Sequence, residues 1–88
     1  MNDLDRQISR CKDQQRDLNR LVDGLKRQIR EADRAIADYR RVSGGDRDVQ
    51  RAKDRQRELQ RELDRRVQDR RSLDRQIDEL RRMARRAG

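Results

Sequence analysis

Apolar residues recur along this chain at alternating intervals of three and four, and this spacing constrains the fold more than any other feature. The first such series visits Leu4, Ile8, Cys11, Gln15, Leu18, Val22, Leu25, Ile29, Ala32, Ile36 and Tyr39. Ten of these eleven residues are apolar, counting Cys and Tyr. The pattern is the heptad repeat of a coiled coil, in which the a and d positions form the seam, with Leu4 at d and Ile8 at a.

A second series begins at Val49 in a different frame. It visits Val49, Ala52, Gln56, Leu59, Leu63, Arg66, Arg70, Leu73, Ile77, Leu80 and Ala84, of which eight are apolar. The two series therefore hold 18 apolar residues at 22 seam positions, where random placement would give roughly seven. Between them lies the turn sequence Ser43-Gly44-Gly45-Asp46, in which Gly44 can end a helix and Asp46 can cap the next one.

The sequence thus predicts an all-α fold of two long helices that form an antiparallel coiled-coil hairpin. We expect a single domain over residues 1–88, with one helix at about 3–42, a turn at 43–46 and a second helix at about 47–86. Folding the chain back at the turn pairs Cys11 with Ile77 and Leu25 with Leu63 in the seam. The flanking e positions then bring Lys12 to Asp74 and Asp33 to Lys53. Each arm of about 40 residues would be about 60 Å long.

The composition does not suit an enzyme. Only 30% of the residues are hydrophobic and half are charged, so the chain cannot build a thick globular core around a site. There is no His for acid–base chemistry, and no glycine-rich phosphate loop or nucleophile motif. We expect no catalytic residues, no cofactor, no metal and no small-molecule ligand, and we interpret Cys11 as a small buried seam residue.

Two charged residues interrupt the seam. Arg66 and Arg70 fall at d and a positions, opposite Val22 and Leu18. One interpretation is a local slip of the repeat, in which Val67 covers the seam while both arginine stems reach outwards. The other is a docking site for a partner, because charges at seam positions cost stability.

The g positions of the first helix, which flank the seam, are all uncharged. They are Gln7, Gln14, Leu21, Gln28, Ala35 and Val42. A wider neutral face suits contact with a further helix, from a second copy in a four-helix dimer or from another protein. An ordinary hairpin flank filled by Gln explains it equally well. The candidate partner or oligomer interface is Gln14, Leu21, Gln28, Ala35, Arg66 and Arg70.

The net charge is +8, and four arginines gather near the C-terminal end. Arg81, Arg82, Arg85 and Arg86 are the candidate phosphate-binding residues. Elsewhere basic and acidic residues alternate, and no aromatic platform exists for single strands. Nucleic-acid binding through this end is therefore the second choice.

The plan of two helices around a central turn is similar to that of the small hairpins secreted by type VII systems. Those carry Trp-x-Gly at the turn, where this chain has Val42-Ser43-Gly44, and their C-terminal Tyr-xxx-Asp/Glu signal is absent here. We expect a non-catalytic structural or adaptor protein that acts through protein–protein interaction, such as a small component of a phage virion, a secretion machine or a motility machine. A substrate or chaperone of a secretion system is the remaining alternative. No apolar run is long enough to insert into a membrane, so we expect a cytoplasmic protein, or one held within a virion or assembly.

Overall fold

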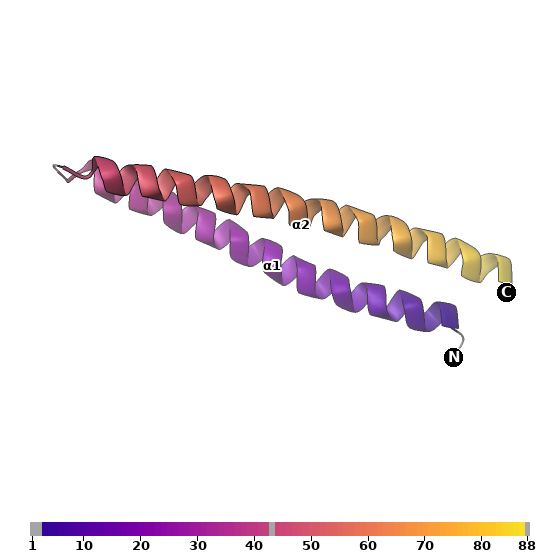
Figure 1. The fold of residues 1–88 in the computed structure, drawn as a ribbon. Coiled ribbons are helices and arrows are strands. Elements are labelled where there is room, and N and C mark those ends of the chain that lie inside the picture. The colour runs from indigo at the N-terminus through magenta and orange to yellow at the C-terminus, as the bar shows by residue number, and fades with distance from the viewer. Residues whose placement is uncertain (1–2, 43, 88) are drawn as a thin grey trace.

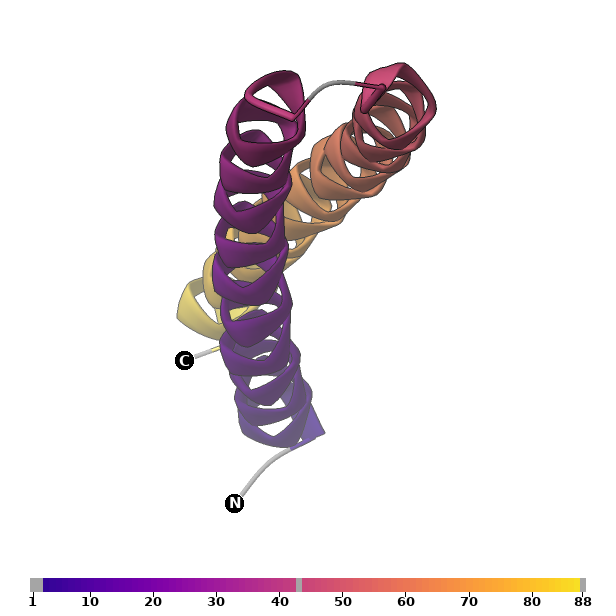
Figure 2. The same ribbon diagram turned by 90° about the vertical axis from the view of Figure 1, so that its left-hand side faces the viewer.

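The computed structural model describes residues 3–42 and 44–87 and consists of two long helices, α1 (Asp3–Arg40) and α2 (Asp46–Ala87). The chain reverses at the short connection between them, so that the helices lie side by side in opposite directions (Figure 1). The molecule measures 68 × 16 × 12 Å. These observations confirm the antiparallel helical hairpin. Viewed after a 90° rotation, α2 crosses behind α1, so the helices wrap across one another (Figure 2).

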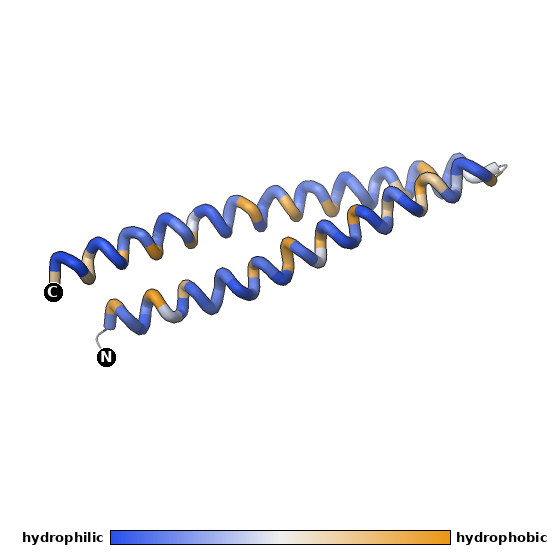
Figure 3. The backbone as a smooth tube through the Cα atoms, turned by 180° about the vertical axis from the view of Figure 1, so that it is seen from behind, coloured by the Kyte–Doolittle hydropathy of each residue, from blue (hydrophilic) through white to orange (hydrophobic). Residues whose placement is uncertain are grey.

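The buried side chains follow the heptad seam closely. Of the 22 seam positions, 21 are buried or partly buried, and Tyr39 beside the turn is the exception. Val22 is fully buried at 0% exposure, and Cys11 packs in one cluster with Ile77 and Leu80 as the predicted register requires. Coloured by hydropathy, the apolar segments recur at intervals along both helices of an otherwise hydrophilic rod (Figure 3). The core is therefore a single line of side chains between two helices.

Two polar seam residues hold the register by hydrogen bonds across the helices. The amide of Gln15 donates to Asp74, and the amide of Gln56 donates to Asp33. Each bond joins an a position of one helix to an e position of the other. The sequence predicted ion pairs instead, between Asp74 and Lys12 and between Asp33 and Lys53. A partly buried amide has a stronger need for a partner than an exposed ammonium group, which water already solvates.

The connection between the helices differs in detail from the sequence prediction. Gly44 has a φ of 84°, the left-handed conformation expected there. Asp46, however, is already the first residue of α2, and Gly45 holds the cap position, since its carbonyl accepts the Val49 N–H at 2.9 Å. A Cβ at Gly45 would lie 2.4 Å from the Tyr39 carbonyl oxygen, so this position requires glycine. Ser43 lies outside the described residues.

Both helices are strongly polar. Within the described residues, neither contains a run of apolar side chains that could carry it through a bilayer.

Candidate binding surfaces

The large hydrophobic side chains that the hairpin leaves exposed gather on one side of it. Leu21 and Met83 are 50% and 44% exposed and occupy g positions, and Val42, at 62%, follows the end of α1 at Arg40. Tyr39, at 40% exposure, is a d residue next to that flank. In an antiparallel pair the g positions of the two helices border the same side of the seam. Exposed apolar surface is therefore concentrated along this one side.

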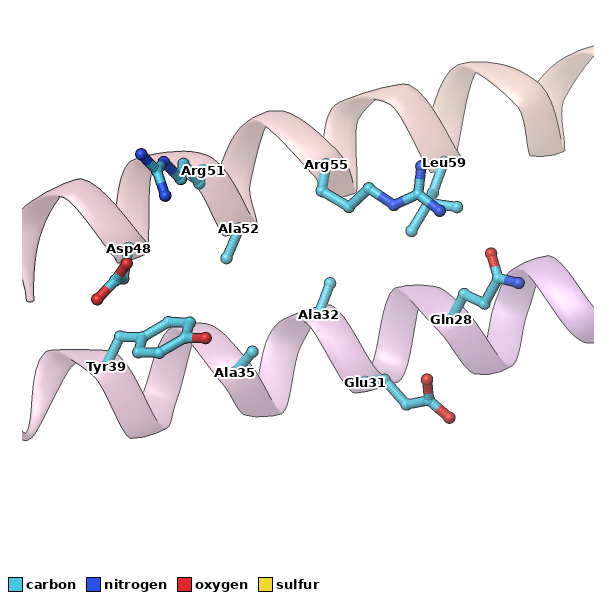
Figure 4. A pocket seen from close by; sticks show the side chains of 10 residues that line it. All are labelled: Gln28, Glu31, Ala32, Ala35, Tyr39, Asp48, Arg51, Ala52, Arg55 and Leu59. Atoms are coloured by element: carbon cyan, nitrogen blue, oxygen red, sulfur yellow. The ribbon is translucent and has the colours of Figure 1, made fainter.

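The same side is hollowed near the turn. A hollow of about 600 Å³ lies between Tyr39, Ala35 and Gln28 of α1 and Asp48, Arg51 and Arg55 of α2. Ala52 of α2 and Ala32 of α1 both point into the space between the helices, and Tyr39 lies along one end (Figure 4). The hollow exists because alanines occupy nearby seam layers, Ala32 opposite Gln56 and Ala52 opposite Ile36, where larger side chains would fill the space between the helices.

Two further hollows continue along this side toward the termini. One, of about 550 Å³, is lined by Leu21, Gly24 and Gln28, and the next, of about 420 Å³, by Gln14, Leu21 and Leu73. Leu21 borders both, and Gln28 joins the first of them to the hollow near the turn. The three hollows form one groove, whose α1 wall includes Gln14, Leu21, Gln28 and Ala35 together with the charged residues Asp17, Arg20 and Glu31.

The groove thus brings together the four α1 residues predicted as an interface. Arg66 also reaches it, because its guanidinium lies 3.9 Å from Glu62 and 3.3 Å from Asp69, which line the groove from α2. Arg70 points to the other flank, where it donates a hydrogen bond of 3.2 Å to the side chain of Asn19. The two seam arginines therefore leave the seam on opposite sides.

Val67 shares the cover of the seam with the stems of these arginines. Arg66, Val67 and Arg70 are all partly buried, and both guanidinium groups reach the flanks. The Nε atom of Arg66 is buried and has no hydrogen-bond partner among the described residues. A buried donor without a hydrogen-bond partner costs free energy, so Arg66 weakens its seam layer. The guanidinium group of Arg70 does have a partner, because it donates to the side chain of Asn19.

Gly24 is a groove residue that sequence reasoning missed. It lies inside α1, one turn after Leu21, and a Cβ there would meet nothing within 4 Å. Helix-interior glycine costs roughly 0.5–1 kcal/mol relative to alanine. The hairpin's own packing therefore does not require glycine at this point. The available signal was a lone Gly in an uninterrupted heptad repeat.

The predicted phosphate-binding residues are all exposed and form two neighbouring pairs. Arg81, at an e position on the flank opposite the groove, lies four residues from Arg85 at a b position. Arg82, at an f position, lies four residues from Arg86 at a c position. Residues four apart are neighbours on a helix surface, so the four arginines spread around the outward side of α2 from the e position to the c position.

Chemistry-bearing groups do not converge elsewhere in the described part of the chain. No three His, Cys, Asp or Glu side chains there lie together as metal ligands would. Cys11 is 5% exposed within the seam, as predicted for a small buried residue. No protein-family model, curated protein or solved structure matches this chain.

Proposed function

We propose that this protein is a non-catalytic structural component that assembles by pairing two hairpins through the groove. The observation that carries the proposal is the position of Leu21. It is the exposed leucine of the hairpin, it borders two of the three hollows, and it lies at the midpoint of α1 (Asp3–Arg40). An apolar residue half exposed in a polar rod gains free energy when a partner covers it.

The partner that best fits this surface is a second copy in antiparallel orientation. A two-fold axis at Leu21 places Leu21 of each copy together, and the full length of both α1 helices overlaps. The same axis sets Gln14 of one copy opposite Gln28 of the other. The Leu21–Leu21 contact and the two Gln14–Gln28 contacts are all neutral, so no like charges meet between these g residues.

The next row of residues gives both attractive and repulsive contacts in this arrangement. The c positions of α1 border these g positions on their outer side, and the axis brings Arg10 of one copy near Glu31 of the other and Asp3 near Asp38, each twice by symmetry. Gly24 falls near Asp17 of the second copy, where the missing side chain lets the two helix backbones approach closely. Exposed ion pairs contribute little energy, but they discriminate between orientations.

The expected affinity is modest. Covering the exposed half of Leu21 contributes roughly 1 kcal/mol per copy. The other uncharged g residues of α1 must therefore supply most of the association free energy. We therefore expect a dimer that dissociates at low protein concentration. Because the association is mainly apolar, salt should change it little. A role within a virion, secretion machine or motility machine stays a prediction.

Mass determination at several protein concentrations tests the proposal. The wild type should form a dimer, and Leu21→Glu should shift it to a monomer without loss of helicity. Ala37→Glu, which introduces the same charge at an exposed position of α1 away from the groove, should remain dimeric. A monomeric wild type at every concentration would remove the second copy as the partner and leave the groove to a helix of another protein.

A further inference from the structure

The outward face of α2 carries most of the positive charge of this protein. Its b, c and f positions hold ten arginines and five acidic residues, a net charge of +5 in a chain of +8. The matching positions of α1 (Asp3–Arg40) hold seven arginines and six acidic residues, a net charge of +1. The excess on α2 is therefore a property of one face, beyond the general basicity of the chain.

This charge concentrates in the C-terminal two thirds of α2. We define the arginine face as Arg61, Arg65, Arg71, Arg75, Arg82, Arg85 and Arg86. Between Arg65 and Arg75 the outward positions hold only Arg, Gln68 and Ser72, with no carboxylate. Outward carboxylates flank this stretch at Asp64, Asp78 and Glu79, so the face from Arg61 to Arg86 holds seven arginines and three acidic residues. Asp74, at the adjoining e position, accepts a hydrogen bond from the amide of Gln15.

The arginines of this face are not neutralised within the hairpin. In the described part of the chain, the arginines that lie within ion-pair distance of a carboxylate are Arg16, Arg55, Arg57 and Arg66, none of which belongs to the arginine face. Arg61 and Arg65, Arg71 and Arg75, and Arg82 and Arg86 are four residues apart. Like charges at that spacing destabilise a helix by roughly 0.2–0.5 kcal/mol per pair. The outward acids Asp64, Asp78 and Glu79 lie three or four residues from these arginines but outside ion-pair distance, so they offset only part of this repulsion. An external polyanion would relieve the rest.

We propose that the arginine face binds the phosphate backbone of double-stranded nucleic acid without sequence preference. From Arg61 to Arg86 the face extends about 38 Å along a straight helix, which is about eleven base pairs of a duplex. The planar guanidinium group of arginine can donate two parallel hydrogen bonds to the oxygens of one phosphate. Five of its seven arginines occupy b and f positions, which point away from the groove, whereas Arg65 and Arg86 occupy c positions, which border it. Duplex binding and hairpin pairing therefore involve largely separate residues.

The chemistry of the face distinguishes a duplex from other polyanions. None of its outward positions from Arg61 to Arg86 carries an apolar side chain that could enter a lipid bilayer, as a membrane-surface helix requires. The face has no aromatic residue on which unpaired bases could stack. A rigid rod of arginines therefore suits the regular phosphate array of a duplex better than a membrane or a single strand.

The test is fluorescence anisotropy with a labelled 25-base-pair duplex of arbitrary sequence, measured across 50–200 mM salt. The variant replaces Arg61, Arg65, Arg71 and Arg75 by Gln. The matched control replaces Arg6, Arg20, Arg27 and Arg34 by Gln on the outward face of α1, which removes the same charge. Circular dichroism verifies that both variants remain helical.

We expect the α2 variant to lose at least about tenfold in affinity at 50 mM salt and the control to lose less than about threefold. Each phosphate contact contributes about 0.9 to the slope of log affinity against log salt, so the slope of the α2 variant should fall by about 3. Replacement of the same four residues by Lys keeps the positive charge, so the slope of log affinity against log salt should stay close to that of the wild type. Equal losses in the two Gln variants would show binding by net charge alone and overturn the proposal.

Two further results would also overturn it. One is a wild-type affinity for the duplex that does not depend on salt. The other is tighter binding to vesicles with anionic headgroups than to the duplex. Leu21→Glu leaves the arginine face intact, and its monomer should keep the same salt dependence per hairpin. Failure of duplex binding and failure of hairpin pairing are thus separate outcomes.

Discussion

Replacing Arg66 with Leu should stabilise the hairpin. Arg66 occupies a seam position with its side chain 38% exposed, and its Nε atom is buried without a partner among the described residues. An unsatisfied buried donor costs roughly 1–3 kcal/mol. Leucine removes that donor and keeps an apolar side chain in the layer opposite Val22.

The substitution also removes two ion pairs within α2, to Glu62 and to Asp69. Exposed pairs at this spacing contribute roughly 0.3–0.5 kcal/mol each, and the apolar part of the arginine stem already covers some of the seam. The net effect should be a gain of about 1–2 kcal/mol in the free energy of unfolding. For a domain of this size the melting temperature should rise by about 4–8 °C per kcal/mol.

Thermal and urea unfolding followed by circular dichroism measure the effect. The control is Arg70→Leu at the neighbouring seam position, which exchanges the hydrogen bond to Asn19 for apolar contact and should change stability by less than about 0.5 kcal/mol. A loss of stability in Arg66→Leu would refute the reasoning, because it would mean that the ion pairs outweigh the buried donor. Equal gains at both positions would show that apolar seam area, rather than the unpaired Nε, sets the energy.

Three other substitutions test the packing. Gly24→Ala should raise the free energy of unfolding of the monomer by about 0.5–1 kcal/mol, since a Cβ meets open space there, while it weakens dimerisation; a mutant that dimerises better would contradict its role in the groove. Gly45→Ala should destabilise the hairpin by about 1–3 kcal/mol, because its Cβ would collide with the Tyr39 carbonyl oxygen, and an unchanged urea midpoint would show that the turn can rearrange. Val22→Ala should cost about 1–3 kcal/mol through a cavity at a position of 0% exposure, and a thermal melt within one degree of wild type would mean that the seam is not packed there.

The fold could be predicted from the sequence because it depends on one strong periodic signal. Seam positions such as Val22, Leu59 and Ile77 lie at the predicted spacing and are buried. The change of frame around Gly44 located the reversal, and its positive φ follows from what only glycine adopts readily. A thin two-helix fold leaves few alternatives once the repeat and the turn are known.

The details that escaped prediction depend on where individual side chains point. Spacing placed Gln15 and Gln56 in the seam but did not say that their amides would reach Asp74 and Asp33. Spacing likewise put Arg66 and Arg70 next to each other without showing that they turn to opposite flanks. Long polar side chains have many rotamers of similar energy, and the facing helix decides among them.

The candidate surfaces were only partly accessible from sequence. The uncharged stripe of α1 was visible as a pattern, and it does line the groove through Leu21 and Gln28. Gly24 escaped because one glycine in a helix has several explanations. The arginine face escaped because clusters in the linear sequence, such as Arg81 with Arg82, differ from clusters around a helix, where these two residues point in different directions.

Disulfide trapping at Leu21 tests the account of pairing most directly. In a Cys11→Ala background, Leu21→Cys should form a covalent dimer rapidly under mild oxidation, because the proposed two-fold axis places residue 21 of one copy against residue 21 of the other, within the distance that a disulfide spans. Arg27→Cys, at an exposed outward position of the same helix, serves as the control and should remain largely unlinked. Equal rates of cross-linking at positions 21 and 27, or no covalent dimer at position 21, would contradict antiparallel pairing through the groove.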